Sequence, residues 1–144
     1  MKISIINTSP HPLPRYQTEA SAAMDVHAYL PNGSIKLDSL DRTAVPTGIY
    51  LAIPNGYELQ VRSRSGLSLN HGIVAVNSPG TIDADFRGEI KILIANIAKE
   101  PYEINDGDRI AQLVVAKHER VDWAETDKLD ETIRGDGGLG HTGR

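Results

Sequence analysis

The sequence predicts an all-β domain that closes as a barrel, sandwich or jelly roll and ends in a flexible, Gly-rich C-terminal arm. The chain contains 13 Gly and 8 Pro, and many of them lie at regular intervals between short runs rich in Ile, Val, Leu, Tyr and Thr. This spacing is typical of an all-β domain. No segment shows sustained helical periodicity, and only 5% of residues are aromatic, so the core is expected to be aliphatic. Strands this short and numerous must close up to hide their edges.

Each predicted element follows from this pattern of turn residues. Runs of aliphatic and β-branched residues place strands at 2–7, 24–29, 43–53, 57–62, 72–76, 89–96 and 109–117. Pro54-Asn55-Gly56 is expected to form a hairpin turn between the third and the fourth of these strands. We expect a helical turn or two at 65–70, which is too short to define the fold class.

Composition limits the classes of function. With 15 Lys and Arg against 19 Asp and Glu, the net charge is −4, and together with the few aromatic residues this weighs against nucleic-acid binding. The absence of Cys excludes disulfides, thiolate metal sites and a Cys nucleophile. The apolar runs are far shorter than a membrane span, and the first residues lack a signal-peptide hydrophobic region. We therefore expect no membrane association and a cytoplasmic location.

The last part of the chain changes character. Residues 124–132 are mostly charged, and residues 135–143 contain five Gly. Such a segment cannot build a core, so we expect a β domain over 1–123 and a flexible arm over 124–144. On composition alone this arm is either a disordered terminus or a segment that folds over a ligand and loses its conformational entropy only then.

Two segments combine residue types that could carry phosphate chemistry or acid–base chemistry. At 62–68, two Arg and one Gly stand where a strand ends and a helical turn begins, which suits a phosphate cradle; the alternative is a solvated turn with an N-capping Ser. At 80–88, an extended chain would place Asp83, Asp85 and Arg87 on one face. These residues form either a salt-bridged hairpin or a general base with an orienting partner.

A third segment, 107–113, begins a strand with a turn, and strand alternation separates Ile110 from Arg109 and Ala111. Gln112 interrupts an apolar run and therefore needs hydrogen-bond partners in protein, water or ligand. The five His residues show no spacing typical of a zinc site.

Taken together and in this order, these segments resemble the five motifs of the trimeric deoxyuridine triphosphatase (dUTPase) family. The resemblance runs from 22 to 143, and the matching segments are Ala22-Ala23-Met24-Asp25-Val26, Arg64-Ser65-Gly66-Leu67, Gly80 to Gly88, Gly107-Asp108-Arg109-Ile110-Ala111-Gln112 and Arg134 to Gly143. The sequence departs from the family pattern at Ala23, where Gly is usual, at Phe86, where Tyr is usual, and at Leu139, where Phe is usual.

The resemblance implies a jelly-roll-like β fold, a homotrimer and three active sites at subunit interfaces, each drawing motifs from more than one chain. It also implies hydrolysis of dUTP to dUMP and pyrophosphate with Mg²⁺ on the triphosphate. By the same resemblance, Asp83 polarises the attacking water and binds the sugar 3′-hydroxyl, and Gln112 helps to place that water. Asp25 acts on the hydration shell of the metal rather than as a direct ligand.

The resemblance also implies which residues contact the substrate. Arg64 and Ser65 hold phosphate oxygens, Asn77 and the hairpin backbone read the uracil edge, and Phe86 packs under the deoxyribose where a 2′-hydroxyl would clash. The arm closes over the ligand. The complete expected set is Arg64, Ser65, Gly66, Asn77, Thr81, Asp83, Phe86, Arg134, Leu139 and Gly140.

Two other functions compete with dUTP hydrolysis. A deoxycytidine triphosphate deaminase shares the fold and binds a similar nucleotide, but its usual Arg-Ser-Ser-x-Ala-Arg segment is not matched by 62–68. A non-catalytic, nucleotide-binding β-trimer is the other alternative. The presence of Asp83, Ser65 and Gln112 argues against lost catalysis.

Overall fold

The computed structural model describes residues 1–139 and 141, and it confirms the all-β fold class. One short helix accompanies strands that are three to nine residues long. The elements in chain order are β1 (Ser4–Asn7), β2 (Met24–His27), β3 (Ile35–Leu37), β4 (Arg42–Pro46), β5 (Ile49–Ala52), β6 (Tyr57–Arg62), α1 (Ser65–His71), β7 (Ile73–Ala75), β8 (Gly80–Ile82), β9 (Lys91–Asn96), β10 (Tyr102–Ile104) and β11 (Arg109–Lys117).

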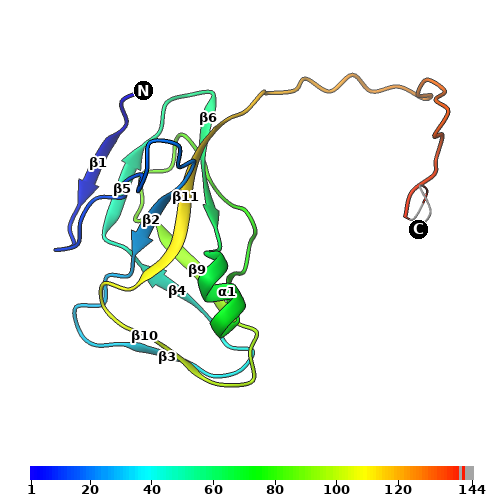
Figure 1. Ribbon diagram of the computed structural model, residues 1–144. Helices are drawn as coiled ribbons and strands as arrows, with labels where there is room; N and C mark the ends of the chain where they lie inside the picture. Colours follow the sequence, from blue (N-terminus) through cyan, green and yellow to red (C-terminus); the bar gives the residue numbers. More distant parts are fainter. Residues whose placement is uncertain (140, 142–144) are drawn as a thin grey trace.

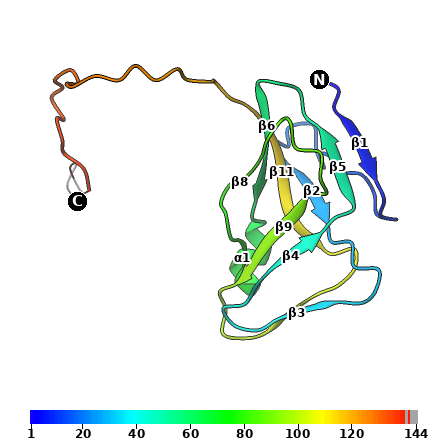
Figure 2. The ribbon, with the colours of Figure 1, turned by 180° about the vertical axis from the view of Figure 1, so that it is seen from behind.

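The strands form antiparallel sheets packed as a sandwich of the jelly-roll type (Figures 1 and 2). The larger sheet has the order β2-β11-β6-β8, and the other main sheet has the order β4-β9-β7. Two further pairs, β1-β5 and β10-β3, complete the body. Neighbours in the larger sheet come from distant parts of the chain, so this sheet brings separate sequence motifs together.

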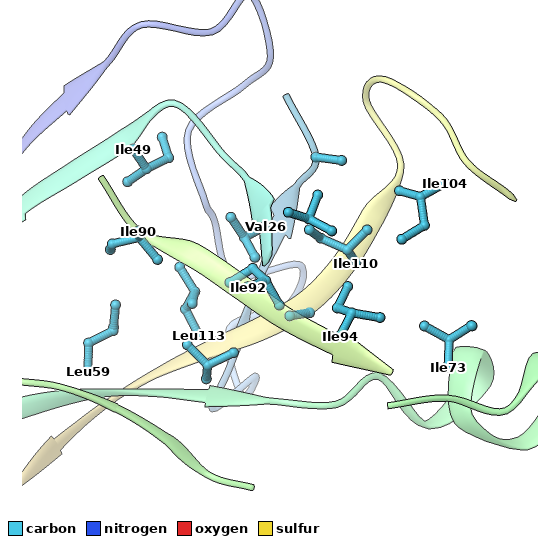
Figure 3. Close-up of a cluster of buried hydrophobic side chains, with 14 of the residues drawn as sticks. Val26, Ile49, Leu59, Ile73, Ile90, Ile92, Ile94, Ile104, Ile110 and Leu113 are labelled. Carbon is cyan, nitrogen blue, oxygen red and sulfur yellow. The ribbon is translucent and has the colours of Figure 1, made fainter. Parts of the chain in front are cut away.

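The core lies between the two main sheets, where β9 crosses over β11 (Figure 3). Ile92 and Ile94 of β9 are fully buried, whereas Leu93 between them is 42% exposed, so β9 alternates as a strand with one core face. From the opposite sheet, Leu59 and Leu113 point into the same cluster. The core is aliphatic, as the composition predicts.

The predicted strand at 43–53 is wrong in one respect, because the structure divides it into β4 and β5. The chain turns at Thr47 and Gly48, where Gly48 has a φ of 69°, a conformation that favours glycine. A Cβ at Gly48 would also lie 3.0 Å from Ser9. The buried Thr47 hydroxyl donates to the carbonyl of Ile90 over 2.6 Å and so holds the corner against the neighbouring segment.

The turn at Pro54-Asn55-Gly56 exists, but the hairpin does not. Tyr57 N–H donates to the carbonyl of Pro54 over 3.2 Å, and Gly56 has a positive φ. However, β5 pairs with β1, whereas β6 pairs with β11 and β8, so the turn connects two different sheets. The strands β3, β8 and β10 were not predicted, because each is three residues long and lacks a visible alternation of apolar and polar residues.

After β11 the chain leaves the body as an extended segment (Figure 1). Every residue from 118 to 136 is exposed, and Trp123 is 91% exposed. The expected division into a domain over 1–123 and a flexible arm over 124–144 stays a prediction. Within residues 1–139 and 141, no helix is long and apolar enough to cross a membrane.

Candidate active site

Asp25 is the centre of a cluster of polar side chains on the outer face of the larger sheet. Its carboxylate is only 9% exposed and carries two ion pairs: Arg64 Nε lies 3.2 Å from Oδ1, and Arg109 Nη1 lies 3.1 Å from Oδ2. Gln112 Nε2 lies 3.5 Å from Oδ1, at the limit of a hydrogen bond. The cluster therefore joins residues from three of the five sequence motifs.

Two local features place Arg64 in this cluster. Arg64 is the N-cap residue of α1 and has an extended backbone, with φ −89° and ψ 125°, and its side chain reaches Asp25 of β2. Its Nη1 also donates to the carbonyl of Arg109 over 2.8 Å. The alternative of an N-capping Ser is wrong, because Arg64 holds that position and its side chain makes no capping hydrogen bond.

The remaining residues of this segment stay accessible. Ser65 and Gly66 are exposed at the start of α1, while the preceding Ser63 hydroxyl accepts a hydrogen bond from Ala75 N–H over 2.8 Å. Gly72 ends the helix in the left-handed conformation with a φ of 65°. The expected contacts of Arg64, Ser65 and Gly66 with phosphate stay predictions. Ser65 and Gly66 are accessible to a ligand in this arrangement.

The start of β11 departs from simple alternation. Ile110 and Ala111 are both buried, although alternation separates them, because the register with β2 shifts between Arg109 and Ala111. Arg109 lies opposite His27, and Gln112 lies opposite Asp25. The expectation that Ile110 and Ala111 face opposite sides is therefore wrong.

A second cluster follows β8 and is built differently. The chain turns directly after the strand, because Phe86 N–H donates to the carbonyl of Asp83 over 3.2 Å. Arg87 Nη1 donates to the carbonyls of Ala84 and Phe86 over 2.7 and 2.8 Å. The extended arrangement with Asp83, Asp85 and Arg87 on one face is wrong, and neither carboxylate forms an ion pair within the described part of the chain.

The expected nucleoside contacts lie around this second cluster. Asp83 and Thr81 are exposed, and Phe86 is 44% exposed. The Phe86 ring lies so close to Gly88 that a Cβ there would be 2.6 Å from the ring. Asn77 lies against Gly80 in the same way, since a Cβ at Gly80 would be 3.0 Å from Asn77 Nδ2. Glycine at both positions lets these side chains lie against the backbone.

A single chain does not bring the two expected catalytic residues together. On the two sides of β6, Ile82 lies opposite Leu59 and Gln112 lies opposite Arg62. These positions are about 10 Å apart along β6 and about 10 Å apart across it, so their backbones are separated by roughly 14 Å. Asp83 follows Ile82 and lies farther still from Gln112, well outside hydrogen-bond reach.

The arm also stays apart from both clusters. Arg134 Nε donates to the carbonyl of Gly137 over 2.8 Å, so this part of the arm forms a local turn. Leu139 is fully exposed, and Gly140 lies outside the described residues. In Figure 1 the described part of the arm points away from the sheet that carries the two clusters.

Arg109 and His27 were not among the predicted site residues. Both line a cavity of about 210 Å³ beside Asp25, together with Arg15 and Gln17. Burial lowers the pKa of His27, and the nearby His11 and Arg109 lower it further. The position of Arg109 in an intact motif could have identified it as a site residue. However, Arg109 and Gln112 are three residues apart, and in a regular strand this spacing places two side chains on opposite faces of the sheet.

Comparison with known proteins gives one consistent answer. The family model described as dUTPase matches residues 9–143. The deoxyuridine 5′-triphosphate nucleotidohydrolase of Finegoldia magna is 55% identical over 143 residues, covering 99% of this chain and 99% of the relative. The protein of the same name from Fusobacterium nucleatum is 48% identical over 144 residues, covering 100% of this chain and 98% of the relative.

Solved structures show the same fold. A mutant dUTPase of Staphylococcus bacteriophage 80alpha with dUpNHpp matches with a TM-score of 0.88 and 22% identity, covering 99% of each chain. A mutant dUTPase from phage phi11 of Staphylococcus aureus, whose structure concerns the coordination of a structural Mg(II) ion, matches with a TM-score of 0.80 and 22% identity. It covers 91% of this chain and 100% of its own.

Proposed function

The chain belongs to the dUTPase family and hydrolyses dUTP to dUMP and pyrophosphate; we propose that it does so at composite sites, in which one chain supplies the Asp25 cluster and a neighbouring chain supplies Asp83. The observation that supports this proposal is the separation of Gln112 from Asp83 across and along β6. A second copy can bring an exposed Asp83 to the Asp25 cluster, whereas one chain cannot.

The Asp25 cluster suits the triphosphate. Arg64 and Arg109 contribute two guanidinium groups against the single carboxylate of Asp25, so the cluster carries a net positive charge in a chain whose overall charge is −4. Guanidinium groups bind phosphate oxygens through charge-assisted hydrogen bonds. Ser65, exposed beside Arg64, adds a hydroxyl donor for the phosphate chain.

The loop after β8 suits the nucleoside and the attacking water. Asp83 is exposed, and its carboxylate can accept a proton from a water that attacks the α-phosphate, with Gln112 of the neighbouring chain orienting that water. Phe86 presents its ring to the deoxyribose, and Asn77 presents an amide to the uracil edge. Positive charge from Arg64 offsets the negative charge that increases on the phosphate during attack.

The metal is expected to arrive with the substrate. Among residues 1–139 and 141, no group of three His, Asp or Glu side chains could hold a metal ion, and both oxygens of Asp25 face arginines. A single carboxylate at the site fits Mg²⁺, because this ion keeps several of its waters and is held largely by substrate phosphates. Bound there, Mg²⁺ would neutralise phosphate charge, and Asp25 would contact its water shell.

We further propose that the protein is a homotrimer, in which the arm of a third chain closes each site with Arg134, Leu139 and Gly140. We also propose a cytoplasmic location, which is consistent with the Cys-free composition. The sequence identity of 55% and 48% to two nucleotidohydrolases, over 99% and 100% of this chain, favours dUTP hydrolysis over a deaminase or a non-catalytic trimer.

Mixing two inactive variants tests the composite site. Asp83→Asn and Gln112→Leu are each expected to be inactive, but in trimers formed by equal co-expression about one quarter of the sites receive both intact residues from different chains. Pyrophosphate release from dUTP should therefore recover to about a quarter of the wild-type rate. Recovery no greater than the sum of the two separate variants would contradict composite sites.

A second pair provides the matched control. Asp25→Asn and Gln112→Leu both alter the same cluster, so no mixture of these chains rebuilds an intact site, and no recovery is expected.

The same assay with dUTP, dTTP, dCTP and UTP measures selectivity, and the wild-type protein should prefer dUTP because Phe86 leaves no room for a 2′-hydroxyl. An inactive wild-type protein with dUTP and Mg²⁺ would refute the function itself.

A further inference from the structure

The register shift at the start of β11 places two side chains that are three residues apart on one face of the sheet. In a regular strand, residues three apart point to opposite faces. Here Arg109 lies opposite His27 and Gln112 lies opposite Asp25, with one extra residue between them. Arg109 and Gln112 consequently both reach Asp25.

The same shift keeps the other side of the strand in the core. Ile110 and Leu113, also three residues apart, are 4% and 1% exposed and both point into the core in Figure 3. Bulges of this kind redirect side chains and occur next to active sites. Because of the extra residue, one short segment packs two side chains into the core and directs two others to Asp25.

Arg109 holds Asp25 through both its side chain and its backbone. Its Nη1 donates to Asp25 Oδ2 over 3.1 Å, and its carbonyl accepts a hydrogen bond from Arg64 over 2.8 Å. Arg64 in turn donates to Asp25 Oδ1. Each oxygen of the carboxylate therefore has its own arginine, and Arg109 is the only partner of Oδ2 within the described residues.

We propose that Arg109 is a positioning residue for dUTP hydrolysis, which the bulge in β11 directs onto Oδ2 of Asp25 so that the carboxylate keeps one orientation toward the metal-bearing triphosphate. The inference rests on the proposed function. Rotation of a carboxylate about its last torsion is only weakly restricted. Without Arg109, Oδ2 has no partner, and the carboxylate turns between orientations of which only one suits the hydrated metal.

The test is a double-mutant cycle between Arg109 and Asp25, measured by calorimetric binding of the hydrolysis-resistant analogue dUpNHpp with and without Mg²⁺. Arg109→Gln should weaken binding with Mg²⁺ by roughly 10- to 100-fold, the range for losing a hydrogen bond to a charged group. Without Mg²⁺ the loss should be several-fold smaller, because only the contribution of the Arg109 charge to the positive cluster is then removed. In an Asp25→Asn background, the effect of Arg109→Gln should be the same with and without Mg²⁺, because the carboxylate through which Arg109 acts on the metal is absent.

Two further variants complete the experiment. Arg109→Lys keeps the charge but loses the planar guanidinium, so an intermediate loss confined to binding with Mg²⁺ is expected. Arg42→Gln is the matched control: Arg42 also begins a strand and is exposed, and it should bind as wild type does in both conditions. If Arg109→Gln does not fold, Arg109→Lys with the same cycle supplies the test.

Three results would overturn the proposal. These are equal losses with and without Mg²⁺, an effect of Arg109→Gln in the Asp25→Asn background that still depends on Mg²⁺, and a lower melting temperature with unchanged dependence of binding on Mg²⁺. The last result would make Arg109 a purely structural ion-pair partner. Wild-type protein that does not hydrolyse dUTP would refute the proposed function instead, so the two failures are distinguishable.

Discussion

The Asp25 cluster and the loop that carries Asp83 lie on the same sheet but are built in opposite ways. Residues of the Asp25 cluster come from β2, from the junction of β6 and α1, and from β11, and they bond to one another across strands. Around Asp83 the hydrogen bonds stay within a few residues, as with Arg87 and the carbonyl of Ala84. One region is a cross-linked, nearly buried group, and the other is an exposed, self-contained turn.

This difference follows from the charge that each region must carry. A buried carboxylate such as Asp25 is stable only with cationic partners in place, so its surroundings must be assembled before the ligand arrives. Asp83 is solvated and needs no such partners within the chain. The first region is thus prepared for a polyanion, while the second presents its groups to a surface outside its own chain.

The largest effect should come from the exposed region. Asp83→Asn removes the proposed general base, so turnover should fall by roughly 10²- to 10⁴-fold, while dUpNHpp binding and the oligomeric state persist. Steady-state release of pyrophosphate measures this. Asp85→Asn, a change of the same type in the same exposed loop, is the matched control and should retain wild-type turnover. Near-normal turnover of the Asp83→Asn variant would remove this carboxylate from the mechanism.

Removal of the arm should have the next largest effect. Deletion of 134–144 removes Arg134, and a lost hydrogen bond to a charged group costs about 1.5–3 kcal/mol, a factor of roughly 10 to 160 in kcat/KM. Arg134→Gln in the intact arm should account for most of this loss. An undiminished kcat/KM after deletion would mean that the Gly-rich end is only a disordered terminus.

A smaller gain should follow from Leu139→Phe. Leu covers a base with apolar surface but offers no ring face, so an added aromatic pair should stabilise the closed arm by about 0.5–1.5 kcal/mol, a factor of roughly 2 to 13. The gain should appear as tighter dUpNHpp binding or higher kcat/KM for dUTP. No gain would indicate that another side chain already fills the space beside the base.

The smallest effect should come from the segment that supports the Asp25 region. His11 Nε2 lies 3.0 Å from Asp106 Oδ1, which also accepts a hydrogen bond from Leu30 N–H. These hydrogen bonds, the one from His11 first, lower the pKa of Asp106. The stability they contribute is therefore present above the ordinary pKa of the carboxyl and is lost as the pH falls through the lowered pKa.

His11→Ala should accordingly lower the melting temperature slightly at pH 7, and the difference from wild type should shrink under acidic conditions. Thermal unfolding at both pH values measures this. His118→Ala is the matched control, because His118 is exposed and its backbone N–H donates to the carbonyl of Gly56. A difference that grows on acidification would contradict the assigned role of Asp106.

Most of the long strands and the short helix were predictable from the sequence, because aliphatic alternation and turn residues act locally. The strand at 57–62 and the strand at 109–117 have the predicted bounds. Three of the four strands of three residues within the described part of the chain, β3, β8 and β10, escaped because so short a run shows no periodicity, whereas β7 was predicted at 72–76. The corner at Gly48 escaped because it depends on contacts with Ser9 and Ile90, far away in the sequence.

The sequence by itself determined the fold class, the aliphatic core and the segments that carry chemistry, because residue type and local spacing are properties of neighbours along the chain. Only the tertiary structure decided which of these residues meet. Asp25 contacts partners that are 39, 84 and 87 residues away, and strand register and one bulge select them. The same register separates Asp83 from Gln112, because packing of the core fixes how far each strand slides past the next.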